Sequence, residues 1–219
     1  MRIRYKPWAR GELEASKFYI DNPEEYKGKW RELYDEDRPF YLELGCGKGG
    51  FISKLASQNP HINYLAIDMV DAMLGLAKRN IENTYNEKEI PINNVYLTRY
   101  DIERILLILD DTDKVDRIYI NFCNPWPRGK HRKKRLTHTR QLEKYKQFLK
   151  DGGEIYFKTD DDGLFNDSLL YFEQAGFEVI DSTYDLANNK EFWDNIETEH
   201  EKMFKEQGIK IKAAIARKK

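Results

Sequence analysis

The fold is indicated first by Phe40-Tyr-Leu-Glu-Leu-Gly-Cys-Gly-Lys-Gly-Gly50, a short apolar run followed by a glycine-rich turn. Residues 40–44 are typical of a buried strand, and we expect a helix over residues 51–57. A glycine-rich turn between a strand and a helix lets a ligand approach the backbone closely and points N–H groups at it. The stretch therefore predicts a ligand-binding strand–helix unit.

Strands and helices alternate along the rest of the chain. Further strands are expected over 62–67, 94–98, 115–121, 152–159, 177–184 and 209–216, and helices over 70–85, 102–109, 139–149, 164–175 and 198–207. This alternation predicts an α/β fold with a mostly parallel sheet and helices on both faces. Residues 11–34 have a helix-like acidic and aromatic pattern. We therefore expect residues 1–38 to form a basic N-terminal arm and a helix that packs on a main domain at residues 39–219.

The composition is that of a globular protein in a reducing compartment. Hydrophobic residues make up 40% and charged residues 34% of 219 residues. No run approaches the roughly 20 apolar residues of a membrane span, and the N-terminus has no apolar signal core. Cys46 and Cys123 lie far apart and lack metal-ligand spacing. We expect a cytoplasmic protein with no membrane span and no metal site.

Positive charge is concentrated after the fourth expected strand. Asn124-Pro125-Trp126-Pro127 predicts a rigid turn, because proline fixes φ and removes a backbone donor. Six of the eight residues from Arg128 to Arg135 are Lys or Arg, although the net charge of the chain is only −1. Such segregation is typical of one anion-binding face, and a solvated basic loop is the alternative.

Acidic residues near the ends of the first three expected strands favour one class of cofactor. The turn at 45–50 satisfies G-x-G-x-x-G, and Asp68 lies near the offset of a ribose-binding acid, so a dinucleotide-dependent dehydrogenase fits both features. Glu43, two residues before Gly45, suits the cationic amino group and sulfonium of S-adenosylmethionine and suits pyrophosphate poorly. Asp101 follows the third strand, where it can meet an adenine edge or, equally well, cap the next helix.

Six short motifs follow one another along the chain. They are Arg2 to Trp8, Glu43-Leu-Gly-Cys-Gly47, Pro125-Trp-Pro127, His131-x-Lys-x-Arg-Leu-Thr137, Lys158-Thr-Asp160 and Thr198-x-x-Glu201. Together they resemble the bacterial tRNA (guanine-N7-)-methyltransferase family. The resemblance implies a Rossmann-like class I S-adenosylmethionine-dependent methyltransferase fold, with a mostly parallel seven-stranded sheet and an antiparallel C-terminal strand. It also implies methyl transfer to N7 of a variable-loop guanine in tRNA.

The resemblance assigns roles residue by residue. It implies cofactor contacts by Glu43, Gly45, Gly47, Asp68, Asp101 and Asn124, substrate contacts by Arg128, Asp160, Thr198, Glu199, His200 and Glu201, and tRNA phosphate contacts by Lys130, Arg132, Lys133, Lys134 and Arg135. Asn124 occupies the catalytic position, where the family usually carries Asp, and Arg128 stands where it usually carries Lys. Guanine N7 has a lone pair and no proton, so its attack needs no general base. We therefore expect Asn124 to orient or stabilise the reacting groups.

Two other functions stay open at this point. An amino-methyltransferase could act on adenine or on a protein amide through residues 124–127, and a non-catalytic protein could bind RNA on a methyltransferase scaffold. Thr198-x-x-Glu201 is also a helix capping box, and residues 160–162 can be a helix-start acid cluster. The sequence leaves monomer and homodimer equally open.

Overall fold

The computed structural model describes residues 5–189 and 195–219, and the chain divides into two compact units, Met1–Asp113 and Lys114–Lys219. Arg2 and Arg4 of the expected basic arm lie outside the described residues. Within the described part of the chain, no helix combines the length and the apolar character needed to cross a bilayer.

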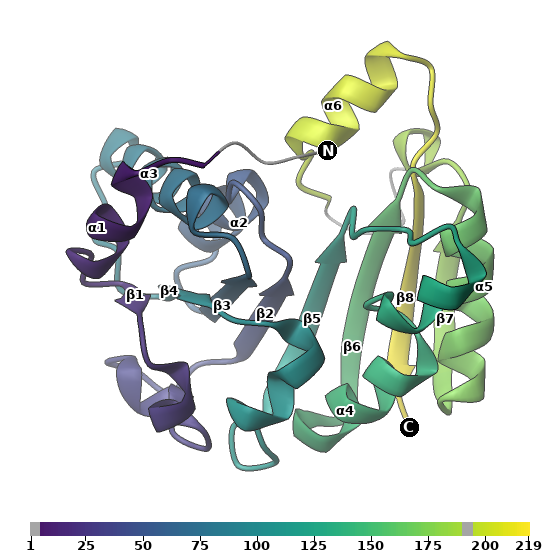
Figure 1. Ribbon diagram of the computed structural model, residues 1–219, viewed down its shortest axis with the longest axis horizontal. Helices are drawn as coiled ribbons and strands as arrows, with labels where there is room; N and C mark the ends of the chain where they lie inside the picture. The colour runs from purple at the N-terminus through teal and green to yellow at the C-terminus, as the bar shows by residue number, and fades with distance from the viewer. Residues whose placement is uncertain (1–4, 190–194) are drawn as a thin grey trace. The chain divides into compact units, whose positions relative to one another are not determined.

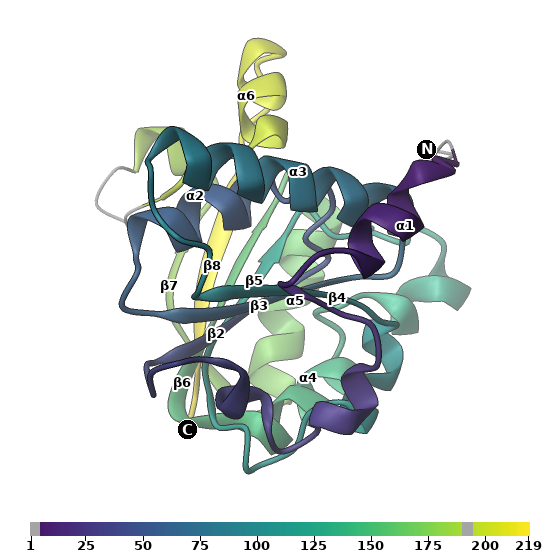
Figure 2. The same cartoon turned by 90° about the vertical axis from the view of Figure 1, so that its left-hand side faces the viewer.

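The first unit is built on parallel strands. These are β1 (Tyr19–Ile20), β2 (Phe40–Leu44), β3 (Asn63–Asp68) and β4 (Val95–Arg99), in the order β1-β4-β3-β2. Helices α2 (Gly50–Gln58) and α3 (Asp71–Glu87) pack against each other beside these strands, and α1 (Trp8–Glu14) packs on α3 (Figure 2). Among the described residues of this unit, 3-10 helices lie at Pro23–Tyr26, Trp30–Leu33 and Ile102–Leu107.

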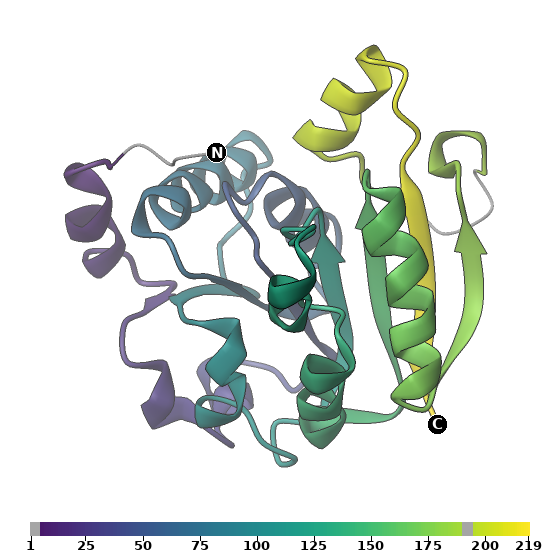
Figure 3. The ribbon, with the colours of Figure 1, turned by 45° about the vertical axis from the view of Figure 1, so that its right-hand side comes forward.

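The second unit combines parallel and antiparallel pairing. Its strands are β5 (Val115–Asn121), β6 (Leu149–Thr159), β7 (Phe177–Thr183) and β8 (Lys212–Lys218), in the order β5-β6-β8-β7. Strands β5 and β6 are parallel, whereas β8 runs antiparallel to both β6 and β7 (Figure 1). The helices are α4 (Thr139–Phe148), α5 (Asp162–Gln174) and α6 (Glu199–Glu206), with 3-10 helices at Gly129–Lys134 and Leu186–Asn188. Helix α5 runs along the strands, and α6 lies beyond the end at which β6 finishes (Figure 3).

All seven expected strands are present, and the C-terminal strand β8 is antiparallel as expected. The expected helix over residues 11–34 is wrong. Helix α1 ends at Glu14, and β1 and two 3-10 helices follow it. The backbone turns at Gly28, where φ is +74°, and the N–H groups of Gly28 and Trp30 donate to the carboxylate of Asp113 at 3.0 and 3.3 Å. These bonds to a residue more than 80 positions away replace the i to i+4 bonds of a helix.

Candidate active site

The glycine turn after β2 is bonded to the end of the neighbouring strand β3. The N–H groups of Gly45 and Cys46 donate to the Ile67 carbonyl oxygen at 2.8 and 3.1 Å. The Gly47 N–H donates to Oδ2 of Asp68 at 2.9 Å. Both Gly45 and Gly47 have positive φ, and a Cβ built at Gly47 would meet open space. Gly47 therefore leaves its backbone accessible to a ligand while its N–H orients Asp68.

A third glycine of the turn serves packing. Gly49 has a φ of +73°, and a Cβ there would lie 2.7 Å from the Cβ of Ala77 on α3. The G-x-G-x-x-G pattern draws attention to Gly50, which is simply the first residue of α2. Only the doubled glycine in the sequence hinted that Gly49 has a separate function.

Asp68 is held as an oriented carboxylate. Its Oδ1 accepts a hydrogen bond from Val70 N at 3.0 Å, in addition to the Gly47 bond on Oδ2. Burial raises the pKa of Asp68 above its usual value, and the backbone N–H donors partly oppose that rise. The adjacent Met69 is 58% exposed. Sequence reasoning missed this apolar surface next to Asp68, for which the only signal was a methionine directly after a strand-end acid.

The other two acids lie at neighbouring strand ends. Glu43 is 2% exposed on β2 and lies beside Ala66 of β3 in the parallel register. A carboxylate buried to this extent is suited to a cationic ligand group. Asp101 follows β4 and accepts a hydrogen bond from Glu103 N at 2.9 Å, so its expected capping role is confirmed. Contact of Asp101 with adenine stays a prediction.

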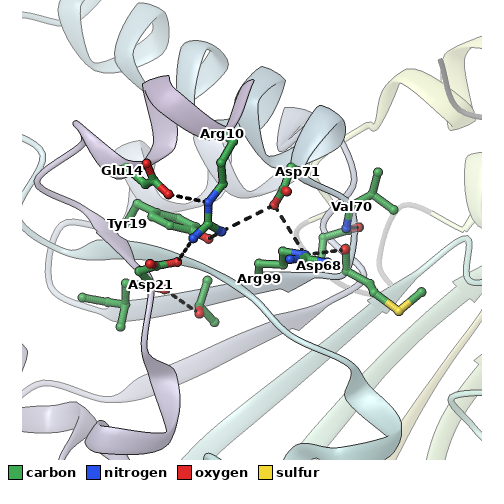
Figure 4. A network of polar contacts seen from close by, with 11 residues as sticks. Arg10, Glu14, Tyr19, Asp21, Asp68, Val70, Asp71 and Arg99 are labelled. Atoms are coloured by element: carbon green, nitrogen blue, oxygen red, sulfur yellow. Dashed lines mark hydrogen bonds and ion pairs between the residues drawn. The ribbon is translucent and has the colours of Figure 1, made fainter. Parts of the chain in front are cut away.

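A polar network supports the turn that contains Asp68 (Figure 4). Arg99 Nε donates to the Met69 carbonyl oxygen at 3.2 Å and lies 3.4 Å from Oδ1 of Asp71. Arg10 of α1 reaches the same Asp71 oxygen at 3.9 Å and also pairs with Asp21. The N-terminal helix is therefore linked by charged contacts to the first turn of α3.

Asn124 lies in a strained turn after β5. The flanking residues Phe122 and Trp126 have φ of +52° and +42°, which is uncommon for bulky residues and costs about 1–3 kcal/mol each. The exposed Asn124 accepts a hydrogen bond from Trp126 N through Oδ1 at 3.0 Å. Burial raises the pKa of the intervening Cys123 to about 12, so its thiol is not a thiolate nucleophile at neutral pH.

The basic run divides into exposed and buried side chains. Its exposed cationic members are Arg128, Lys130, Arg132, Lys133 and Lys134. Lys134 Nζ lies 5.2 Å from the ring centroid of Trp126, and Arg132 lies 3.4 Å from Asp167. Arg135 is only 3% exposed, and its guanidinium donates to the Pro125 carbonyl oxygen at 2.7 Å and to Asp167 at 2.5 Å. The structure gives no support to the expected phosphate contact by Arg135, because the side chain is buried and its Nε and Nη1 donate within the protein.

Asp160 directly follows β6, and its backbone carbonyl accepts a hydrogen bond from a neighbouring strand. Lys212 Nζ donates to the Asp160 carbonyl oxygen at 2.9 Å and pairs with Asp162 at 2.7 Å. Asp161 caps α5 by accepting from Leu164 N at 2.6 Å. The expected helix-start acid cluster is thus present, and the half-buried Asp160 carboxylate is its member not engaged in these contacts.

The Thr198-x-x-Glu201 motif is an internal clamp. Thr198 Oγ1 accepts from Glu201 N at 3.1 Å, and Glu201 Oε2 accepts from Thr198 N at 2.8 Å, which confirms the capping box. Lys158 of β6 is fully buried and donates to the same Glu201 oxygen at 2.7 Å. Asn195 Nδ2 donates a hydrogen bond to the other carboxylate oxygen of Glu201, Oε1, at 2.8 Å. The structure gives no support to the expected substrate contact by Glu201, because its carboxylate binds neighbouring groups of the protein.

Helix α6 presents its other two expected contact residues outward. Glu199 and His200 are exposed. The His200 ring stacks on Phe122 with a centroid distance of 5.4 Å and an interplanar angle of 19°. Helix α6 is thereby anchored to residues at the ends of both β5 and β6.

Comparison with known proteins connects these features to a family. A family model described as "Putative methyltransferase" matches residues 37–214. A tRNA (guanine-N(7)-)-methyltransferase from Clostridium beijerinckii is 62% identical over 218 residues, which cover 100% of this chain and 99% of that protein. A protein of the same name from Acetivibrio thermocellus is 53% identical over the full length of both chains. The chain belongs to the bacterial tRNA (guanine-N7-)-methyltransferase family.

Comparison with solved structures identifies the fold. The 16S rRNA methyltransferase KamB aligns with a TM-score of 0.62 and 15% identity, over 86% of this chain and 92% of that chain. The aminoglycoside resistance methyltransferase NpmB1 aligns with a TM-score of 0.58 and 18% identity, over 87% and 92%. Similarity at this level of identity shows the fold alone. The expected Rossmann-like class I methyltransferase fold is confirmed.

Proposed function

We propose that this chain transfers a methyl group from S-adenosylmethionine to N7 of a variable-loop guanine in tRNA. The observation that carries the proposal is full-length similarity to tRNA (guanine-N(7)-)-methyltransferases at 50–62% identity. The strained Asn124 turn next to five exposed cationic side chains agrees with a reactive site beside a polyanion. A cytoplasmic location follows from a tRNA substrate and stays part of the proposal.

The first unit supplies groups that fit the cofactor. Glu43 offers a buried carboxylate to the amino group, Asp68 offers oriented oxygens to the ribose hydroxyls, and Gly47 leaves room for close approach to the backbone. S-adenosylmethionine, when bound, supplies an electrophilic methyl group on a sulfonium. Exposed Met69 can pack on an adenine face, and Asp101 can accept from the adenine amino group.

The second unit supplies the contacts to RNA. Exposed Arg128, Lys130, Arg132, Lys133 and Lys134 can neutralise phosphates, while Asp160 and His200 are available to the guanine. No residue has to remove a proton, because guanine N7 attacks through its lone pair. The contribution of the protein is therefore alignment, together with stabilisation of the positive charge that develops on the guanine ring.

Nucleoside mass spectrometry tests the proposal directly. An unmodified tRNA transcript is incubated with the purified protein and methyl-deuterated S-adenosylmethionine, then digested to nucleosides. Labelled 7-methylguanosine is the expected product. Label on an amino nitrogen would instead identify an amino-methyltransferase, and tight tRNA binding without label would identify a non-catalytic RNA-binding protein.

A further inference from the structure

Arg135 and Thr137, near the end of the motif that begins at His131, are buried in the protein. Arg135 is 3% exposed and Thr137 is fully buried. Arg135 donates to Asp167, and Thr137 Oγ1 lies 2.6 Å from Ser168 Oγ. Asp167 and Ser168 are adjacent on α5, so the end of the basic run is attached to this helix at two successive residues.

The Arg135 guanidinium also holds the turn that carries Asn124. Its Nε donates to the carbonyl oxygen of Pro125 at 2.7 Å. The two prolines of this turn have no backbone N–H, and the N–H of Trp126 is already bonded to Asn124. A charge-assisted hydrogen bond to Pro125 therefore restrains the Pro125–Trp126 peptide unit, one residue beyond Asn124.

Backbone strain makes that restraint necessary. Phe122 and Trp126 both adopt left-handed conformations, which persist only where the surroundings hold them in place. On the strand side, Phe122 N donates to the Lys158 carbonyl oxygen at 2.9 Å. On the loop side, Pro125 is held by Arg135. Without the Arg135 bond, the strain at Trp126 can relax by moving Asn124.

We propose that Arg135 and Asp167 form a positioning pair that fixes the Asn124-Pro125-Trp126 turn for methyl transfer. The inference rests on the proposed function. Helix α5 begins at Asp162, two residues after Asp160, so the pair also connects the Asn124 turn to the helix that follows this other expected substrate contact. Arg135 acts through Asn124 and does not touch RNA, in contrast to the exposed cations that precede it in the sequence.

Two substitutions, one that removes a positive charge and one that removes a negative charge, distinguish a positioning role of the pair from an electrostatic effect on RNA binding. An electrostatic role predicts weaker tRNA binding in Arg135→Gln and tighter binding in Asp167→Asn. Positioning predicts that both lower kcat at saturating tRNA by about 10- to 100-fold, the scale of a misplacement near 1 Å. The double variant is then no slower than the slower single variant, because both changes break the same pair.

Further variants serve as controls within the same segment. Lys133→Gln removes the same charge from an exposed side chain, and we expect it to raise the KM for tRNA while kcat holds. Arg135→Lys keeps the charge, but one ammonium group cannot reproduce the two directed bonds of the guanidinium. Positioning therefore predicts a low kcat for Arg135→Lys, whereas an electrostatic role predicts a value close to that of the wild type. Thermal unfolding verifies that each variant is folded at the assay temperature.

Hydrogen exchange over residues 122–128 provides a readout that does not depend on activity. The Trp126 amide should exchange faster in Arg135→Gln and Asp167→Asn, and at the wild-type rate in Lys133→Gln. The proposal is overturned if Arg135→Gln behaves like Lys133→Gln, with weaker tRNA binding, intact kcat and unchanged exchange. Absence of 7-methylguanosine from the wild-type reaction would refute the proposed function instead, and exchange would still decide whether the positioning pair exists.

Discussion

Replacement of Lys158 by methionine breaks a buried ion pair, and its effect on stability can be worked out from the contacts. The Lys158 side chain is 0% exposed and that of Glu201 is 7% exposed, at a separation of 2.7 Å. Removal of one partner of a buried pair costs about 3–5 kcal/mol, because a charge stays buried without compensation. Glu201 would keep hydrogen bonds from Thr198 N and Asn195 Nδ2. We therefore expect a loss near the lower end, about 3 kcal/mol.

The partner substitution and the double variant complete the test. Glu201→Gln leaves a carbonyl that can still accept from Lys158, so we expect a loss of about 2 kcal/mol, within the range for a hydrogen bond to a charged group. The double variant removes both charges, and its loss should be at least about 1 kcal/mol smaller than the sum of the single losses. Urea unfolding, followed by two spectroscopic probes to verify a two-state transition, measures all four free energies. Single losses below about 1 kcal/mol, or additive losses, would contradict this account of the clamp.

Other predictions concern the cofactor, the reaction and the RNA. In the proposed function, ionised Asp68 accepts hydrogen bonds from two ribose hydroxyls. Burial raises the pKa of Asp68, so this ionised form is lost at a higher pH than for an ordinary aspartate. Calorimetry should show cofactor affinity falling as pH drops through that raised pKa, and Asp68→Asn should lower affinity at neutral pH by about 10- to 100-fold. Asn124→Asp adds a negative charge near the developing cation, and single-turnover kinetics should show an increase of about fivefold, equivalent to about 1 kcal/mol. Alanine at Lys130, Lys133 and Lys134 should reduce the slope of log affinity against log salt by roughly 0.7–0.9 per lost phosphate contact, measured by filter binding.

Local patterns predicted most of the fold. Each expected strand is an apolar run between glycine, asparagine or charged residues, and a short run of this kind predicts a buried strand. Residues 11–34 were misread because their structure depends on distant partners. Asp113 bonds the backbone near Gly28 and Trp30, and the Trp30 indole donates to the Ile108 carbonyl oxygen at 2.6 Å. A helix-like pattern in this stretch could not reveal those bonds.

Parts of the site were predictable for the same reason. Asp68 is oriented by its own strand end and by a glycine turn 21 residues away, both of which are sequence motifs. The sequence does not show which of the arginines in the basic run are exposed and which are buried. Both Arg132 and Arg135 lie within 4 Å of the Asp167 carboxylate, but only Arg135 is buried, where it also donates to the Pro125 carbonyl oxygen. The resemblance located Thr198 and Glu201, but only the buried partner Lys158 shows that these residues clamp helix α6 internally.

The division of the basic run also bears on how the protein recognises RNA. Five of the six cations from Arg128 to Arg135 are exposed, and one of these, Arg132, lies 3.4 Å from the Asp167 carboxylate. The salt dependence of RNA binding increases with the number of phosphates that the protein neutralises. Cations already paired with acids of the protein therefore contribute less to this salt dependence than their number in the sequence suggests. Buried Arg135, Lys158 and Lys212 bond the segments that carry Asn124, Glu201 and Asp160. We therefore propose that one class of side chain has two functions that differ in burial. Exposed cations would attract the polyanion, and buried cations would hold the turns on which alignment of the reacting atoms depends.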